Sequence, residues 1–409
     1  MKGKTVSRKL VQFGAGNIGR SFIGQLFARN GYEVVFVDID ETLAREINAR
    51  KQYRVIIKRN EKPDEAIVVK NVRAVDGRNT GRVAREIQTA GYLSTSVGKG
   101  ALPSIMQPIA EGLEIRFSSA ASHPPLDIII AENIRNGAAY FREELAKLLP
   151  PGFPFEEKTG LVETSIGKMV PIMKAEDTAR DPLWVFAEEY NTLIVDRRGF
   201  VFGVPPFPQI KAVEKITAYV DRKLFIHNLG HAAAAYLGYR ENPDYVYIWE
   251  ALENPDLFDT VRACMEESGR ALHAEYPEDL PEKDLKKHID DLLRRFRNKA
   301  LGDTIFRVGR DLYRKLQKND RLIGAMLLAG KQGCPYDNIA SATAESFFFR
   351  AGDEQGEMYP RDAEFAQNEF PKGPEHILTA VSGLSKNNGL EKAVMEKVIG
   401  EYRRLEGDR

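Results

Sequence analysis

The spacing of apolar residues differs between the two halves of the chain. In the first half, short apolar runs rich in valine, isoleucine and phenylalanine alternate with stretches whose apolar residues recur every three or four positions. The short runs are typical of buried strands, and the longer spacing is typical of amphipathic helices. Strands that alternate with helices predict a parallel sheet covered on both faces. We expect strands, with their terminal turns, over 9–16, 32–40, 91–98 and 126–133, and helices over 17–31 and 41–52.

The second half has helical spacing throughout. It follows the segment GVPPFPQI (203–210), whose three prolines in four positions suit a linker. The chain is therefore predicted to hold an α/β domain over residues 1–204 and a mainly α-helical domain over residues 205–409. Helices of the second domain are expected over 216–238, 259–276, 283–298 and 390–406.

The composition agrees with two globular domains. The 409 residues are 43% hydrophobic and 29% charged, and they exceed the size of one ordinary core. Basic and acidic residues number 59 each, so no overall charge favours nucleic acid or a membrane as partner. Apolar runs are too short for a membrane span, and the first residues do not resemble a secretion signal. With only Cys264 and Cys334, we expect a cytoplasmic protein without a disulfide framework.

A glycine pattern joins the first predicted strand to the first predicted helix. The segment GAGNIG (14–19) has the form G-x-G-x-x-G, which is a weak signal in isolation and a much stronger one in this place. Here Gly14 permits a tight turn, Gly16 lets the backbone approach a pyrophosphate, and Gly19 allows close helix–strand packing. The pattern predicts a Rossmann-type dinucleotide-binding domain, with the phosphates at the helix N-terminus.

An acidic residue follows at the end of the second predicted strand. Asp38 has close to the spacing expected of the residue that binds the adenosine ribose hydroxyls. Its carboxylate would repel the additional phosphate of NADP, so NAD is the predicted cofactor. Asp40 is a rival for the same role, and an ordinary aspartate at a strand end is the structural alternative.

A second group of polar residues lies in the helical half, within DRKLFIHNLGH (221–231). At about 100° per residue, Lys223, Asn228 and His231 fall within one half of a helix surface among large apolar residues. A buried lysine without a partner is costly and tends to lose its proton, as a base must. The alternative is a lysine that extends to solvent beside a locally bonded amide and imidazole, and for any one residue alone that alternative is favoured.

The spacing Lys-x4-Asn-x2-His resembles the signature of the polyol-specific long-chain dehydrogenases, the mannitol dehydrogenase family. The resemblance covers essentially the whole chain, and within the family it is greatest to the branch that acts on mannitol phosphate. Further segments resemble this family in the same order, namely FGAGNIGR (13–20), TSVG (95–98), AENIRNG (131–137), MEESG (265–269) and RVGRDLYRKLQKNDRL (307–322).

The resemblance implies roles that fit the oxidation of an alcohol, which needs a base, donors to the developing alkoxide and a nicotinamide. Lys223 matches the catalytic base. Asn228 and Asn133 match amides that hold the reacting oxygen, and His231 matches a residue that orients the polyol. His227 lies outside the motif and is expected to be structural. The implied cofactor-binding residues are Phe13, Gly14, Ala15, Gly16, Asn17, Ile18, Gly19, Asp38, Val97 and Gly98.

Basic residues gather in the segment 307–322. On a continuous helix Arg307, Arg310 and Arg314 would line one face, and a solvated basic face is the structural alternative. The resemblance places Arg307 and Lys315 beside the polyol, whereas Arg310 and Arg314 resemble the mannitol-phosphate branch. Because an arginine fork can hold a phosphate with two parallel bonds, we expect these four residues to bind the substrate.

The expected activity is the NAD-dependent interconversion of mannitol 1-phosphate and fructose 6-phosphate by a monomer. Six scattered histidines and two cysteines offer no zinc ligand set, so a metal-independent reaction is predicted. Alternatives are a related enzyme of free polyols or of hexuronates such as tagaturonate or fructuronate, and a catalytically silent NAD-binding sensor.

Two positions depart from parts of the family. Val220 replaces a glutamate that is common in members acting on free mannitol, and Lys168 stands where an arginine is common, so we assign Lys168 no role. No chemistry is assigned to 65–77 or 352–365, which are expected to form ordinary sheet and surface loop.

Overall fold

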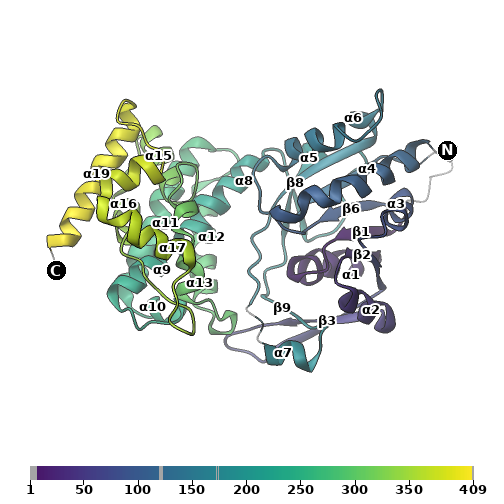
Figure 1. Ribbon diagram of the computed structural model, residues 1–409, viewed down its shortest axis with the longest axis horizontal. Coiled ribbons are helices and arrows are strands. Elements are labelled where there is room, and N and C mark those ends of the chain that lie inside the picture. Colours follow the sequence, from purple (N-terminus) through teal and green to yellow (C-terminus); the bar gives the residue numbers. More distant parts are fainter. Residues whose placement is uncertain (1–6, 119–122, 172, 174, 408–409) are drawn as a thin grey trace. The chain divides into compact units, whose positions relative to one another are not determined.

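The computed structural model describes residues 7–118, 123–171, 173 and 175–407 (Figure 1). The chain divides into two compact units, Met1–Ile216 and Thr217–Arg409. The sequence placed the division after residue 204, whereas in the structure residues 205–216 belong to the first unit.

The first unit is built on an eight-stranded sheet with the order β11-β10-β8-β7-β6-β1-β2-β5. Neighbouring strands are parallel except for β8 and β10, which confirms the predicted α/β domain with a parallel sheet. The strands are β1 (Lys9–Phe13), β2 (Glu33–Asp38), β5 (Val72–Asp76), β6 (Tyr92–Thr95), β7 (Leu126–Ile130), β8 (Thr159–Ser165), β10 (Leu193–Asp196) and β11 (Ile210–Val213).

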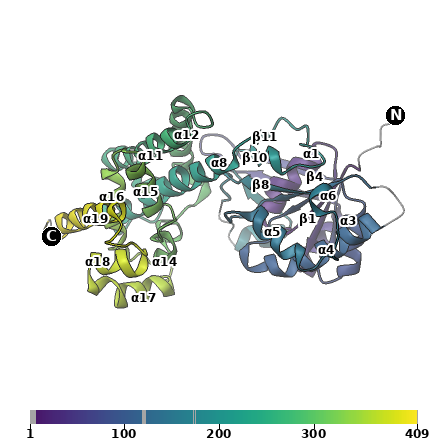
Figure 2. The ribbon, with the colours of Figure 1, turned by 90° about the horizontal axis from the view of Figure 1, so that it is seen from above.

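Both faces of this sheet are buried. Successive residues of a strand point to opposite sides, so neighbours in one strand belong to different cores. Leu10 of β1 packs in one core and Val11 in the other. Helices α3, α4 and α5 cover the face of Val11, and the helix after the glycine loop covers the opposite face (Figure 2). The helical elements are η1 (Gly19–Gly24), α1 (Gln25–Arg29), α2 (Glu41–Arg50), α3 (Thr80–Gln88), η2 (Lys99–Ala101), α4 (Leu102–Ser118), α5 (Gly137–Ala146), α6 (Phe155–Lys158), α7 (Ala175–Arg180) and η3 (Arg197–Gly199).

A second sheet of three strands, in the order β4-β3-β9, packs against the core that contains Leu10. Its strands are β3 (Gln52–Ile57), β4 (Glu65–Lys70) and β9 (Val185–Ala187). The proline segment also contributes to this unit. Phe207 packs edge-to-face on Phe27 and Tyr32, and β11 pairs with β10.

The second unit is mainly helical, as predicted. Helix α9 is buried and contacts α10, α11, α13 and α16. Small residues of α9 allow α11 to pack closely against it, because a Cβ added to Gly230 would lie only 2.5 Å from the Met265 sulfur. The helical elements are α8 (Ile216–Arg222), η4 (Lys223–Asn228), α9 (Leu229–Glu241), α10 (Ile248–Ala251), α11 (Pro255–Glu275), α12 (Glu282–Phe296), η5 (Lys299–Leu301), α13 (Ile305–Gly309), α14 (Leu312–Lys315), α15 (Ile323–Lys331), α16 (Asp337–Ser346), α17 (Pro360–Asn368), η6 (Phe370–Lys372), α18 (Pro374–His376), η7 (Ile377–Val381) and α19 (Gly389–Gly407).

The expectation of a surface loop over 352–365 is wrong at its C-terminal end. Pro360 begins α17, where its fixed φ suits the first helical position. Asp362 is only 2% exposed, because its carboxylate bonds backbone groups of a segment distant in the sequence. Among the residues described, no helix is both long and apolar enough to cross a membrane.

Candidate active site

The three glycines of the first loop differ in what surrounds them. Gly14 has φ +87°, and a Cβ there would lie 2.6 Å from the Ser96 carbonyl oxygen. A Cβ on Gly19 would collide with the Gly14 carbonyl, whereas one on Gly16 would meet no atom within 4 Å. Gly14 and Gly19 are therefore needed for the turn and its packing. The backbone at Gly16 is open to a ligand, as a dinucleotide-binding loop requires.

Asp38 lies beside this loop. Its carboxylate accepts hydrogen bonds from the backbone N–H of Ala15 at 2.6 Å and of Asp40 at 3.0 Å. The rival Asp40 caps α2 instead, since its side chain accepts from the Leu43 N–H at 2.9 Å. Phe13 ends β1, and Asn17 and Ile18 begin the helix that continues through η1. Asp38 and the loop thus occupy the carboxyl ends of neighbouring parallel strands.

The other predicted residues of the first unit lie at the same edge of the sheet. Val97 and Gly98 follow β6, and Asn133 follows β7, where it is exposed. Glu132 joins the two segments, because its buried carboxylate accepts from the N–H of Val97 at 2.8 Å and of Gly98 at 2.9 Å. Burial raises the pKa of Glu132. The sequence prediction missed this residue, and its only signal was an acid directly before Asn133 at a strand end.

In the second unit, the polar segment is helical but not α-helical. Residues Lys223–Asn228 form η4, a π-helical turn between α8 and α9. A π turn bonds residue i to i+5 and has more residues per turn than an α-helix, so the angle between Lys223 and Asn228 is smaller than the α-helical value of about 140°. The structure therefore brings these two side chains onto one side of the helix more closely than the α-helical spacing predicted. Such turns occur frequently at functional sites.

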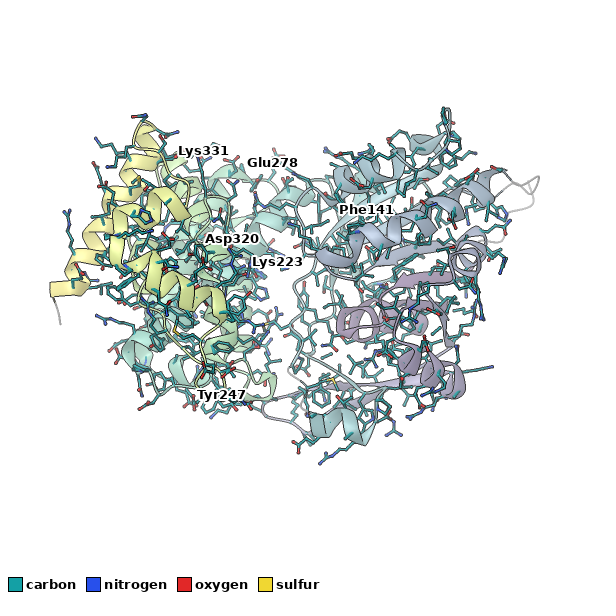
Figure 3. All side chains as sticks on the ribbon, in the orientation of Figure 1. Phe141, Lys223, Tyr247, Glu278, Asp320 and Lys331 are labelled. Atoms are coloured by element: carbon teal, nitrogen blue, oxygen red, sulfur yellow. The ribbon has the colours of Figure 1, made fainter. Side chains whose placement is uncertain are left out.

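Lys223 lies near a second cation. It is partly buried, and the segment containing Asp320 and Arg321 lies close to it (Figure 3). Burial, together with the charge of Arg321, lowers the pKa of Lys223 to about 8. The lysine can therefore exchange a proton near neutral pH, which an ordinary lysine cannot do readily.

His231 is held between an aromatic ring and a carboxylate. Its imidazole stacks on Phe296, with ring centroids 4.6 Å apart and planes 5° from parallel. Its Nε2 lies 3.3 Å from Oδ2 of Asp303, and Oδ1 of Asp303 contacts Arg307. At 3.3 Å the imidazole contact is a close approach rather than an aligned hydrogen bond. Burial, followed by the charge of Arg307, holds the pKa of His231 well below its usual value, so the imidazole is neutral.

Asp303 thus connects two residues that the sequence assigned to the polyol. It was missed because its only signal is an aspartate four residues before Arg307. His227, expected to be structural, is buried with its ring 5.6 Å from that of Phe296, and burial lowers its pKa well below the usual value.

The expectation of a continuous helix through Arg307, Arg310 and Arg314 is wrong. Helix α13 ends at Gly309, and α14 begins only at Leu312. Arg310 is extended, with φ −57° and ψ 162°, and Asp311 has φ +74°. The helix breaks here because backbone N–H and C=O groups at the break bond side chains instead of one another. The i, i+3, i+7 spacing of the arginines does not reveal these partners.

The break separates the basic residues from one another. Arg310 is exposed, and its guanidinium lies 5.7 Å from the Phe306 ring and 5.6 Å from the Tyr359 ring. Arg314 is exposed and bonds Asp311 at 2.6 Å. Lys315 is buried, and its ammonium donates to the carbonyls of Val308, at 2.6 Å, and of Arg310.

Lys168, to which no role was assigned, bonds backbone carbonyl groups of the first unit. Its ammonium donates to the carbonyls of Glu188 at 3.1 Å and Tyr190 at 2.6 Å. Over the described part of the chain, no three His, Cys, Asp or Glu side chains are grouped in a way that could hold a metal ion.

A parallel sheet with a dinucleotide-binding loop, followed by a helical unit that carries a lysine of lowered pKa, defines the class of two-domain dinucleotide-dependent dehydrogenases. Residues 8–209 match the family model of the mannitol dehydrogenase Rossmann domain, and residues 215–400 match that of the mannitol dehydrogenase C-terminal domain. The chain therefore belongs to the mannitol dehydrogenase family, and it is a polyol dehydrogenase with an NAD-type dinucleotide cofactor.

Individual proteins are similar to this chain in sequence or in fold. The chain is 34% identical over 394 residues to a mannitol-1-phosphate 5-dehydrogenase of Brevibacillus brevis, covering 95% of this chain and 96% of the relative. A substrate-free D-sorbitol dehydrogenase structure has a TM-score of 0.78 at 18% identity, covering 97% of this chain and 93% of the other. A mannitol 2-dehydrogenase of Pseudomonas fluorescens, solved with NAD and D-mannitol, has a TM-score of 0.73 at 17% identity, covering 96% and 91%. At such identities the solved structures establish the fold alone.

Proposed function

We propose that this protein interconverts D-mannitol 1-phosphate and D-fructose 6-phosphate with NAD. The observation that carries the proposal is the presence of two exposed arginines, Arg310 and Arg314, in the segment that also contains Arg307. A phosphorylated substrate needs such cations, whereas a free polyol does not. The identity to the Brevibacillus brevis mannitol-1-phosphate 5-dehydrogenase supports the same choice.

The proposed cofactor is NAD rather than NADP. The Asp38 carboxylate beside the open glycine loop supports this, because it can accept bonds from ribose hydroxyls and would repel a phosphate in their place. The proposed cofactor contacts are the loop residues Phe13 to Gly19, Asp38, and the pair Val97 and Gly98. When bound, the nicotinamide accepts a hydride from the carbinol carbon.

The second unit supplies the acid–base chemistry of this proposal. Lys223 Nζ takes the proton of the substrate hydroxyl during oxidation and returns it during reduction of the ketone. The amides of Asn228 and Asn133 donate hydrogen bonds to the oxygen as negative charge develops on it. His231, neutral and stacked on Phe296, orients the polyol. Lysine and amides replace a Lewis acid here, so we propose a reaction without a metal ion.

The four basic residues are expected to contribute unequally to substrate binding. Arg310 is the strongest candidate for the phosphate, because it is exposed and its guanidinium rests on two aromatic rings. Arg314 shares its charge with Asp311, and Arg307 shares its charge with Asp303. Two of the three N–H donors of Lys315 already bond carbonyls, so its contribution to substrate binding is the smallest of the four.

A related activity on free polyols or hexuronates is the alternative, because the family includes enzymes of more than one polyol. We further propose that the protein acts as a monomer in the cytoplasm, as the resemblance and the composition suggest.

A substrate screen tests the proposal. NADH oxidation is measured with fructose 6-phosphate, fructose and keto-uronates, and the expected result is a strong preference for fructose 6-phosphate. Arg310→Ala should raise KM for fructose 6-phosphate by about 10- to 100-fold, the value of a lost charge-assisted hydrogen bond, and should leave fructose unaffected. Arg404→Ala is the control, because Arg404 is also exposed and lies on α19, which carries none of the proposed substrate residues. Preference for a free sugar or uronate would contradict the proposal.

A further inference from the structure

The break between α13 and α14 is clamped from both sides. On the α14 side, the Asp362 carboxylate accepts hydrogen bonds from the N–H groups of Asp311 and Leu312, both at 2.8 Å. On the α13 side, the carbonyls of Val308 and Arg310 accept from the Lys315 ammonium. The hydroxyl of Tyr236 adds a third contact, at 2.9 Å to the Gly309 carbonyl. Asp362 and Lys315 are 2% and 4% exposed, so water offers these backbone groups little alternative.

The clamp determines where Arg310 points. A continuous helix would keep Arg310 on the face of Arg307, but the extended conformation of Arg310 takes it off that helix. Asp311 is held at φ +74°, which is unfavourable for most residues without such bonds. Removal of the two bonds to Asp362 would therefore favour regular helical geometry, and Arg310 would turn away from its present position.

The segment that carries Asp362 also supports the Arg310 side chain. Tyr359 precedes α17 by one residue, and its ring lies 5.6 Å from the Arg310 guanidinium. One short stretch, Tyr359–Asp362, thus fixes both the backbone and the side chain of the same arginine. This stretch lies outside every segment that resembled the family signature.

We propose that Asp362 is a positioning residue that determines specificity for the phosphorylated substrate by holding Arg310 in place. This inference rests on the proposed function, in which Arg310 binds the phosphate. Asp362 does not touch the substrate, and it acts through the Asp311–Leu312 backbone. Loss of the carboxylate should therefore weaken binding of the phosphate and leave the hydride transfer step intact.

A matched residue separates this role from a general contribution to stability. Glu267 is 3% exposed, and its carboxylate also accepts from two consecutive N–H groups at a helix start, those of Asn338 and Ile339, both at 3.1 Å. The helix that it caps, α16, carries none of the proposed substrate residues. Glu267→Gln should lower the melting temperature as Asp362→Asn does, with no change in substrate preference.

The experiment compares KM and kcat for fructose 6-phosphate and for fructose in wild type, Asp362→Asn, Glu267→Gln, Arg310→Ala and the double variant Asp362→Asn/Arg310→Ala. We expect Asp362→Asn to raise KM for fructose 6-phosphate by about tenfold, with kcat and the fructose reaction changed less than about threefold. In the Arg310→Ala background, Asp362→Asn should have almost no further effect, because coupled residues are not additive.

Different outcomes overturn different claims. Equal losses on both substrates, or additive effects in the double variant, would show that Asp362 supports only the fold. A wild type that prefers fructose or a uronate would overturn the proposed function and this inference together. Should Asp362→Asn not fold, Tyr359→Leu removes the ring beside Arg310 and keeps the clamp. It should then raise KM for fructose 6-phosphate selectively, and an unchanged KM would refute the positioning role of the stretch.

Discussion

The glycine loop of the first unit and the arginine segment of the second both present groups suited to an anion, but they are built differently. In the loop the groups are backbone N–H donors, and their geometry follows from the positive φ of Gly14 and the missing side chain of Gly16. In the arginine segment the groups are side chains, and their directions depend on a helix break held by Asp362 and Lys315. A backbone-built site is therefore encoded within a few residues, whereas a side-chain-built site depends on distant ones.

Carboxylates also serve the two regions differently. In the first unit Asp38 and Glu132 accept from backbone N–H groups and so fix the shapes of loops. In the second unit Asp303 contacts an imidazole and a guanidinium, in surroundings where several cations lie close together. Burial, reinforced by the charge of neighbouring cations, keeps His231 neutral and lowers the pKa of Lys223, so the proposed proton transfer depends mainly on the second unit.

The sharpest test of this comparison removes the proposed base of the second unit. Lys223→Ala should lower kcat by about 10²- to 10⁴-fold, the usual loss of a positioned acid–base group. The dissociation constant of NADH, measured by fluorescence titration, should stay unchanged because the glycine loop belongs to the other unit. Lys331→Ala, which removes an exposed lysine paired with Glu275, is the control and should behave as wild type. Near-normal kcat in the Lys223 variant would rule out the proposed base.

Substitution of the two proposed amide donors, one in each unit, tests whether both act on the reacting oxygen. Asn133→Ala in the first unit and Asn228→Ala in the second should each lower kcat by about 10²- to 10³-fold, with little change in KM, since the charge on the oxygen develops in the transition state. Steady-state kinetics with fructose 6-phosphate measure both values. If either variant raised only KM, that amide would anchor the substrate instead.

A smaller effect is expected from Asp38 in the first region. Asp38→Ala should raise KM for NADH by about 10- to 100-fold and improve the relative use of NADPH, because a carboxylate that accepts from the ribose is lost and repulsion of a phosphate is relieved. Asp40→Ala is the matched control, and it should affect the stability of α2 rather than cofactor preference. Unchanged preference in the Asp38 variant would argue against its contact with the ribose.

The smallest expected effect concerns the charge environment of Lys223. Because its pKa is lowered to about 8, the unprotonated base increases as pH rises through that value. Mannitol 1-phosphate oxidation should therefore rise with pH near 8, and fructose 6-phosphate reduction should fall. Arg321→Gln removes the cation beside the lysine, so its pKa should rise and both profiles should move to higher pH. Profiles of kcat/KM that do not move would exclude Arg321 as a cause.

The pH dependence of folding follows from the same lowered pKa. Between about 8 and the ordinary lysine value, the unfolded chain binds more protons at Lys223 than the folded chain does. The contribution of this lysine to stability therefore rises with pH in that window, in the same direction as oxidation activity.

The sequence by itself determined the α/β and helical halves, the covered parallel sheet and the glycine loop. Each depends on short-range periodicity or on backbone freedom at single residues such as Gly14. The segments containing Lys223, Asn228 and His231 could also be found from their spacing, but not the π turn between them, since helical spacing does not specify which hydrogen bonds form.

Only the tertiary structure decided where the helix breaks, which carboxylates hold the cations and how far each pKa moves. Arg307, Arg310 and Arg314 have helical spacing, yet Asp362 and Lys315 offer the backbone better partners than a continuous helix would. Asp362 itself lay in a stretch expected to be surface loop, because nothing local marks an aspartate whose partners are far away along the chain. Buried hydrogen bonds and charges depend on which segments contact one another in the folded chain, and the periodicity of apolar residues does not predict those contacts.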